Sequence, residues 1–245
     1  MKRSAKKTSS GGKIFGILFA LLAVIVIVVG FLFFNPFGGK ASNTAKKTNG
    51  SSTSASSQTI KYEPSQEEKD YLKNRFDQLI AVNPEAIAYV YAPGTELDEP
   101  VVQTTDNETY LNKTFDGGNV PYLGTVFMDM DNKKDFSDRL TWLFGHARGS
   151  KVGDHRMFND VNFYDKQDYF DQHPYVVIET PERKYYYEAM CLVIVPETTA
   201  FYRTSFKDDK DFTTQLKKVY EDGQTKNPNI KIKASDKYLV LSTCR

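Results

Sequence analysis

Tyr238-Leu239-Val240-Leu241-Ser242-Thr243-Cys244-Arg245 is the stretch on which the fold prediction rests. Large apolar and β-favouring residues fill its first half without a Gly or Pro, so the stretch predicts a strand. Successive side chains of a strand point to opposite faces, and both faces of this one are apolar, which is typical of a central strand. Cys244 places a thiol at the C-terminal end of the strand, a suitable position for a nucleophile.

Leu140-Thr141-Trp142-Leu143-Phe144-Gly145-His146 has the same design, an apolar strand with a reactive side chain at its exit. If the two strands are parallel neighbours, His146 and Cys244 meet at one edge of the sheet. A Cys–His pair suits nucleophilic catalysis because the thiolate attacks, and a neighbouring imidazolium stabilises it and protonates a leaving amine. From the pair alone, a buried strand cysteine and an unrelated loop histidine remain the alternative.

Short apolar runs separated by turn residues recur from Ala86 onwards and predict a mainly β domain with helical inserts, a barrel or a sandwich. The predicted strands are Ala86–Tyr91, Glu99–Gln103, Gly124–Met130, Leu140–His146, Tyr175–Glu179, Lys184–Val195 and Tyr238–Cys244.

Three helices are predicted around these strands. The first begins at the capping box Ser65-Gln66-Glu67-Glu68 and ends at Asn83-Pro84. The second lies around Arg156–Tyr169. The third covers Phe206–Asp222, with Ser205 as its N-cap and Gly223 as its stop.

Residues 14–34 contain no charged side chain and span about 31 Å as a helix, so they predict a transmembrane anchor. Residues 1–13 form a basic tail, which the positive-inside rule keeps cytoplasmic, with the rest of the chain on the extracellular face. A cleaved signal peptide is the alternative, but the apolar run is long for one and no small-residue cleavage pattern follows it. Residues 35–64 form a linker, rich in Ser and Thr over Lys40–Thr59.

Charge and composition exclude several classes of function. The first 60 residues contain eight Lys or Arg and no acidic residue, which leaves residues 61–245 with 24 basic and 31 acidic residues. A net negative domain argues against general nucleic-acid binding. Two Cys and three His leave little room for a structural zinc site, and Asp154, His155 and His146 lack a ligand spacing. We therefore expect no metal and no cofactor. Cys191 is predicted to be a small buried side chain, with a Cys191–Cys244 disulfide as the alternative.

Leu241-Ser242-Thr243-Cys244 and Phe144-Gly145-His146 resemble the Leu-x-Thr-Cys and Gly-His signatures of sortases, the cysteine transpeptidases of Gram-positive surfaces. The resemblance covers nearly all of residues 65–245, and the helical insert between Val195 and Ile230 points to class B. The other segments that resemble the family are Asn83-Pro84-Glu85, Ile87-Ala88-Tyr89, Pro93-Gly94-Thr95, Pro100-Val101-Val102-Gln103, Asp106-Asn107-Glu108, Tyr110-Leu111, Gly124-Thr125-Val126-Phe127-Met128-Asp129 and Met157-Phe158 with Tyr164.

The resemblance implies a closed sortase-type β-barrel, preceded by the N-terminal helix and the transmembrane helix. It implies that Cys244 attacks a C-terminal Asn-Pro-x-Thr-like sorting motif of secreted proteins after the Thr. The resulting thioacyl intermediate is then resolved by an amine of the peptidoglycan cross-bridge or its lipid-linked precursor. His146 would transfer protons, and Ser242 and Thr243 would contact the substrate. The protein is thus expected in the cell membrane as a single-pass enzyme.

One departure from the family concerns the residues after Cys244. Sortases carry a catalytic Arg on the strand that follows the Cys strand, whereas this sequence ends at Arg245, which lies on the wrong face to replace it. The expectation is a truncated gene product or fragment that lacks the last strand and leaves an apolar sheet edge exposed. Two other functions stay open: a catalytically impaired surface protein that binds sorting signals, and an extracellular cysteine protease.

Overall fold

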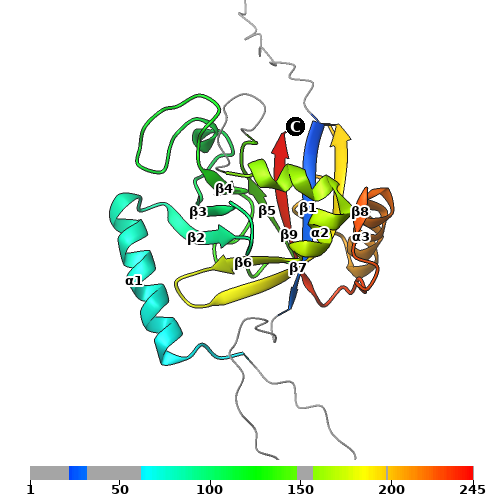
Figure 1. Ribbon diagram of the computed structural model, residues 1–245, viewed down its shortest axis with the longest axis horizontal. Helices are drawn as coiled ribbons and strands as arrows, with labels where there is room; N and C mark the ends of the chain where they lie inside the picture. Colours follow the sequence, from blue (N-terminus) through cyan, green and yellow to red (C-terminus); the bar gives the residue numbers. More distant parts are fainter. Residues whose placement is uncertain (1–21, 32–61, 148–156, 197, 245) are drawn as a thin grey trace, which may run out of the picture.

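The computed structural model of the protein describes residues 22–31, 62–147, 157–196 and 198–244, and it is built around one curled sheet of nine strands (Figure 1). The strand order is β1-β9-β5-β4-β3-β2-β6-β7-β8, and β1 also pairs with β7. The strands are β1 (Leu22–Phe31), β2 (Ala86–Tyr91), β3 (Asp98–Val102), β4 (Val126–Met128), β5 (Leu140–Phe144), β6 (Tyr175–Glu179), β7 (Lys184–Pro196), β8 (Thr225–Lys226) and β9 (Lys237–Cys244). The seven predicted strands correspond to β2 to β7 and β9, so the mainly β prediction is confirmed.

β9 and β5 are parallel neighbours, as the sequence predicted, and their register runs from Leu140↔Tyr238 to Phe144↔Ser242. The two faces of β9 are buried in different places, which explains why both are apolar. Leu239 and Leu241 belong to the core inside the curl, whereas Tyr238 and Val240 pack beneath α3.

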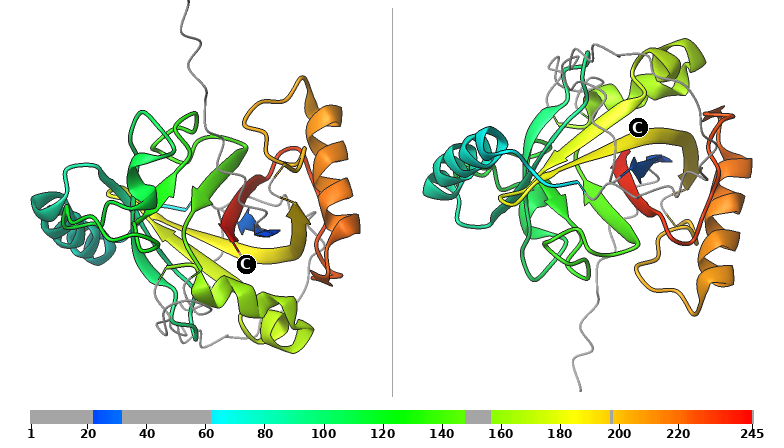
Figure 2. Two further views of the ribbon diagram at one scale, coloured as in Figure 1. Left: turned by 90° about the horizontal axis from the view of Figure 1, so that it is seen from above. Right: turned by 90° about the horizontal axis from the view of Figure 1, so that it is seen from below.

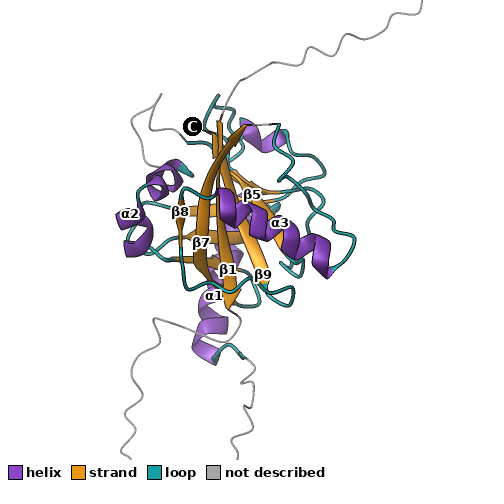
Figure 3. Ribbon diagram, turned by 90° about the vertical axis from the view of Figure 1, so that its right-hand side faces the viewer, coloured by secondary structure: helices purple, strands orange, loops and turns teal. Residues whose placement is uncertain are grey.

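α3 (Asp209–Asp222) lies across the outer face of the sheet over β7 and β9 (Figure 3). Its buried stripe consists of Phe212, Leu216 and Val219. The predicted start at Phe206 with a Ser205 cap is wrong. Asp208 caps the helix instead, because its carboxylate accepts a hydrogen bond from the Asp211 N–H at 2.8 Å.

The C-terminal end of α3 and the other predicted helices also differ from the structure in part. Gly223 ends α3 with an ordinary φ of −62°, and its N–H bonds to the Tyr220 carbonyl, so no left-handed stop is used. The predicted helix around Arg156–Tyr169 is two short elements, the 3-10 helix η2 (Asn159–Asp165) and α2 (Gln167–Gln172), and residues 148–156 lie outside the described residues. A further 3-10 turn, η1 (Thr109–Leu111), was not predicted.

α1 (Gln66–Val82) lies on the opposite side of the sheet from α3 (Figure 2). Ser65 caps it as predicted, by accepting the Glu68 N–H at 3.1 Å. Besides its buried Leu72 and Phe76, the helix is held by Arg75, whose Nε lies 3.3 Å from the buried Glu179 carboxylate of β6. Lys184 of β7 approaches the same carboxylate at 2.7 Å, so one buried acid joins α1 to two strands.

β1 is the described part of the predicted transmembrane anchor, and in the structure it is a strand. It pairs antiparallel with β9, from Ala23↔Cys244 to Gly30↔Lys237, and antiparallel with β7. The expectation of an exposed β9 edge is therefore wrong, because an uninterrupted apolar segment supplies the backbone partners that this edge needs. In the described part of the chain, no helix combines the length and apolarity needed to cross a bilayer. Residues 1–21 and 32–61, which include the predicted basic tail and most of the linker, lie outside the described residues.

Candidate active site

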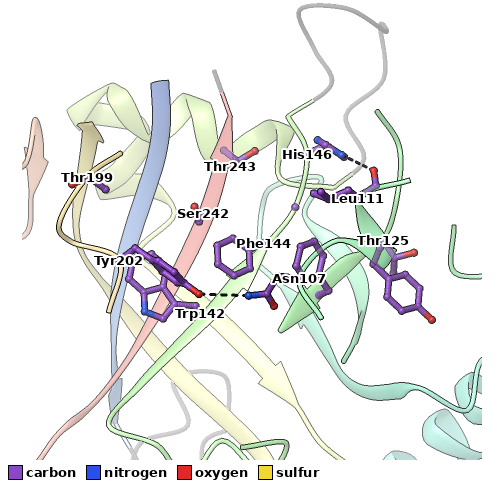
Figure 4. Close-up of a pocket in the computed structure, with 13 residues that line it drawn as sticks. Asn107, Leu111, Thr125, Trp142, Phe144, His146, Thr199, Tyr202, Ser242 and Thr243 are labelled. Atoms are coloured by element: carbon purple, nitrogen blue, oxygen red, sulfur yellow. Dashed lines mark hydrogen bonds between the residues drawn. The ribbon is translucent and has the colours of Figure 1, made fainter. Parts of the chain in front are cut away.

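A pocket of about 330 Å³ opens beside the C-terminal ends of β5 and β9 (Figure 4). Trp142 and Phe144 of β5 form its floor, with Phe127 of β4 tilted against Phe144 at a ring distance of 5.3 Å. Tyr202, from the connection between β7 and α3, meets the Trp142 ring edge-on at 5.2 Å. The complete lining is Asn107, Tyr110, Leu111, Thr125, Phe127, Trp142, Phe144, Gly145, His146, Thr199, Tyr202, Ser242 and Thr243.

The parallel register of β5 and β9 determines where the two candidate catalytic residues lie. Phe144 pairs with Ser242, so extending both strands by two residues brings His146 opposite Cys244. The Gly145 N–H continues the ladder by donating to the Ser242 carbonyl at 3.1 Å. The Cys244 side chain lies outside the described part of the structure, and its backbone is the last residue of β9.

His146 is half-buried, and its ring is oriented by the main chain of the neighbouring loop. Its Nε2 lies 2.7 Å from the Leu111 carbonyl oxygen. A carbonyl can only accept, so Nε2 carries a proton, and Nδ1 is left to exchange protons with a reacting group. The His146 carbonyl accepts from the Phe158 N–H at 3.0 Å, which fixes the backbone on the other side.

Ser242 and Thr243, the two predicted substrate contacts, both line the pocket. Thr243 is 3% exposed, and its Oγ1 has no hydrogen-bond partner in the described part of the protein. A buried hydroxyl without a partner costs free energy, so a group that supplies one on binding gains that amount. The structure therefore places a hydrogen-bonding group without a partner directly before Cys244. Whether Ser242 and Thr243 contact substrate stays a prediction.

Gly124 sets the position of the loop that orients His146. Its φ is +61°, and a Cβ there would lie 2.2 Å from the Tyr110 carbonyl oxygen and 2.8 Å from the Leu111 carbonyl oxygen. The latter oxygen is the partner of the His146 ring. Only glycine permits this close approach.

We expect Gly124→Ala to destabilise the protein by about 2–3 kcal/mol and to lower the activity of the folded fraction, because the Leu111 carbonyl must move. Urea unfolding and turnover measured on the same samples check both effects. Gly117→Ala is the matched control, since Gly117 also has a positive φ of 89° but nothing lies within 4 Å of its Cβ position. Equal effects of the two substitutions would contradict the steric argument.

The connection that carries Tyr202 is fastened by a salt bridge to α3. The Arg203 guanidinium contacts the Asp211 carboxylate at 3.0 and 2.6 Å, and the Arg203 carbonyl accepts from the Trp142 indole N–H at 2.9 Å. The hydrogen bonds from Arg203, and then that from the Lys207 N–H, lower the pKa of Asp211 from 3.8 to about 2. No local sequence pattern predicts this arrangement, because it joins a residue of a loop to a residue of a helix.

This low pKa predicts a pH dependence of stability. Because the folded-state pKa lies below the unfolded value, the contribution of Asp211 is present above about pH 4 and is lost as the pH falls towards 2. We expect the parent protein to exceed Asp211→Asn in urea midpoint at pH 6, with the difference shrinking between pH 4 and pH 2. Trp142 fluorescence reports the transition. A difference that does not change with pH would contradict the assignment.

None of the residues that line the described pocket is Lys or Arg. Arg245 lies outside the described residues, as do Asp154 and His155 of the spacing that was set aside as a metal site. In the described ranges, no group of three or more His, Cys, Asp or Glu side chains is arranged to hold a metal ion.

Cys191 is a free, buried cysteine on β7, so the alternative of a Cys191–Cys244 disulfide is not found in the structure. Burial raises the pKa of its thiol to about 12. A thiol that stays protonated at neutral pH is a poor nucleophile, which agrees with a packing role.

Comparison with known proteins adds to this geometry. No protein-family profile matches the sequence. The chain is 26% identical over 176 residues to Sortase B of Staphylococcus aureus (strain NCTC 8325 / PS 47), covering 72% of this chain and 70% of that protein. It is 28% identical over 175 residues to Sortase B of Listeria monocytogenes serovar 1/2a (strain ATCC BAA-679 / EGD-e), covering 71% and 68%. The solved structure of the Staphylococcus aureus sortase B–substrate complex superposes with a TM-score of 0.65 at 26% identity, over 71% of this chain and 77% of that one.

Proposed function

We propose that this chain is a membrane-anchored cysteine transpeptidase of the sortase family, because its relatives at 26–28% identity are class B sortases. It cleaves a C-terminal Asn-Pro-x-Thr-like sorting motif after the Thr and joins the acyl part to a cell-wall amine. The observation that supports the proposal is the parallel register of β5 and β9, in which Phe144 pairs with Ser242. Continued by two residues, this register would set His146, which lines the pocket, opposite the backbone of Cys244.

In the acylation half, the Cys244 thiolate attacks the Thr carbonyl carbon, and the C–N bond of the scissile peptide breaks. The leaving nitrogen takes a proton from His146, which gives an amine product and a thioester on Cys244. In the second half, an incoming amine attacks the thioester carbon and loses a proton to His146. The C–S bond then breaks, and the thiolate is restored.

The pocket supports peptide binding through two kinds of surface. Trp142, Phe144 and Tyr202 offer apolar faces for the side chains of an extended peptide. Thr243 offers a hydroxyl for a main-chain group of that peptide. The relative whose complex is known binds a substrate, which supports the same use of the groove here.

Stabilisation of the negative oxygen in the tetrahedral intermediate is assigned to backbone N–H groups. Removing one such donor elsewhere costs about 2.7–4 kcal/mol of barrier, so the rate depends strongly on how many remain. This dependence keeps the second candidate, a surface protein that binds sorting signals without turning them over, as the alternative.

The membrane anchor at residues 14–34, with a cytoplasmic N-terminus and an extracellular domain, is part of the proposal. It rests on the uncharged run and on the basic residues before it, and it requires Leu22–Phe31 to leave the sheet, where the structure pairs it with β7 and β9. The acceptor is proposed to be an amine of the peptidoglycan cross-bridge or of its lipid-linked precursor.

Product analysis separates the candidate functions. The full chain in detergent is incubated with a fluorogenic Asn-Pro-x-Thr peptide, with and without triglycine as an amine. Cleavage with a product joined to triglycine supports transpeptidation. Cleavage to the free acid under both conditions favours a protease, and binding without cleavage favours the impaired binding protein.

A further inference from the structure

Asp129, directly after β4, has a fully buried carboxylate that lies behind the pocket rather than in its lining. One oxygen, Oδ1, accepts from the Asp131 N–H at 2.9 Å. The other, Oδ2, accepts from the Asn107 side-chain amide at 3.0 Å and from the Tyr202 hydroxyl. Two of the three donors therefore belong to residues that line the pocket.

This carboxylate is held by neutral donors. Among the described residues no ion pair includes Asp129, and its contacts there are hydrogen bonds from neutral groups. Burying a charge in this way is costly unless each contact is well formed. Burial and the hydrogen bond to Asp129 raise the pKa of Tyr202, so its hydroxyl keeps the proton that it donates.

The two pocket residues come from separate segments of the chain and meet at the pocket. Asn107 lies in the loop before η1, and Tyr202 lies in the connection between β7 and α3, 95 residues later (Figure 4). The side-chain oxygen of Asn107, Oδ1, accepts a hydrogen bond from the Met130 N–H at 2.9 Å, and its side-chain nitrogen, Nδ2, lies 3.5 Å from the Tyr202 hydroxyl. Both ends of the Asn107 amide are thus fixed by contacts around Asp129.

The Tyr202 ring depends on its hydroxyl for its position because the residue is 45% exposed. With the hydroxyl held, the ring stands edge-on to Trp142 at 5.2 Å and to Phe144 at 6.1 Å. Without the hydrogen bond to Asp129, the outer end of the exposed ring keeps only the longer contact of its hydroxyl with the Asn107 amide at 3.5 Å.

We propose that Asp129 is a positioning residue. It holds the segments that carry Asn107 and Tyr202 together at the pocket and thereby sets how tightly the pocket binds the peptide. The inference deepens the proposed function and rests on it for the identity of the ligand, an extended sorting-signal peptide. Asp129 touches neither the peptide nor the reacting atoms, so it acts on binding and leaves the chemical step to His146 and Cys244.

Asp129→Asn tests this with the smallest change of shape. The amide has one oxygen for three donors, so at least one of the Asn107, Asp131 and Tyr202 contacts is lost. Tyr202→Phe removes the same link from the other side and keeps the aromatic ring. Asp138→Asn is the control, because Asp138 accepts from the Lys133 N–H and the Asn132 amide in the loop before β5 and does not line the pocket.

Peptide binding to the full chain is measured through the fluorescence of Trp142, the single tryptophan, which lines the pocket. We expect Asp129→Asn and Tyr202→Phe each to weaken binding of an Asn-Pro-x-Thr peptide about ten-fold, the scale of one charge-assisted hydrogen bond. The double variant is expected to be no weaker than Asp129→Asn within about two-fold, since both substitutions break one link. For Asp129→Asn, kcat at saturating peptide is expected to stay within about two-fold of the parent value, while KM rises with Kd.

Asp138→Asn is expected to lower the melting temperature and leave the peptide Kd unchanged. The inference is overturned if Asp129→Asn behaves in the same way, or if the effects of Asp129→Asn and Tyr202→Phe add in full. Binding without turnover by the parent chain would overturn the proposed function and leave the Kd comparison valid. Absence of peptide binding by the parent would overturn both.

Discussion

Replacing Cys244 by alanine is expected to lower peptide cleavage and amine transfer by about 10⁴-fold or more, to the background rate. The reason is that no thioester can form without the Sγ atom. Binding of the peptide should survive, because the pocket floor of Trp142 and Phe144 does not depend on the thiol. Turnover assays and the fluorescence of Trp142 measure the two properties separately.

Cys191→Ala is the matched control for the loss of a thiol. Cys191 is buried, and its raised pKa keeps it protonated, so its removal should leave the activity of the folded protein unchanged. The assignment of Cys244 fails if Cys191→Ala abolishes turnover and Cys244→Ala does not.

His146→Gln is expected to lower kcat by about 10²- to 10⁴-fold, the range that general acid–base groups contribute. Glutamine can still donate an N–H to the Leu111 carbonyl, so the loop contact is kept while the titrating ring is lost. The peptide Kd should therefore change little. Steady-state kinetics with the Trp142 binding assay check both statements.

His173→Gln controls for removal of an imidazole elsewhere. That ring packs against Tyr169 at a ring distance of 4.1 Å with a tilt of 36°, one of its nitrogens lies 2.9 Å from the Tyr169 carbonyl oxygen, and it does not line the pocket. Its substitution should leave kcat unchanged. A parent-like kcat for His146→Gln would show that His146 does not transfer the proton.

The sequence was sufficient to predict the part of the site that depends on strand pattern. β5 and β9 are uninterrupted apolar runs, and strand parity with a parallel pairing predicts that their ends meet. Asp129 and the Tyr202 contact could not be predicted in the same way. They join residues from three separate segments, and no local pattern of either residue reports the partner.

Helix ends and the segment at Leu22–Phe31 show the limits of local rules. Ser205 and Asp208 both satisfy the cap preference, and the choice of Asp208 depends on how Phe206 packs edge-on against Phe212. An uninterrupted apolar run such as Leu22–Phe31 fits a membrane helix and also fits a strand buried on both faces. The periodicity of the sequence does not distinguish a membrane helix from such a strand. The pairing of Leu22–Phe31 with β7 and β9 can be seen only in the folded sheet.

In the proposed reaction, Cys244 carries the acyl group of the sorting peptide as a thioester. This thioester can be detected by intact-mass spectrometry of the full chain, mixed briefly with an Asn-Pro-x-Thr peptide and then quenched with acid. We expect a mass increase equal to the acyl part of the peptide, located on Cys244, absent from Cys244→Ala and discharged by triglycine. Peptide cleavage without an adduct, or an adduct that persists in Cys244→Ala, would rule out Cys244 as the acyl carrier.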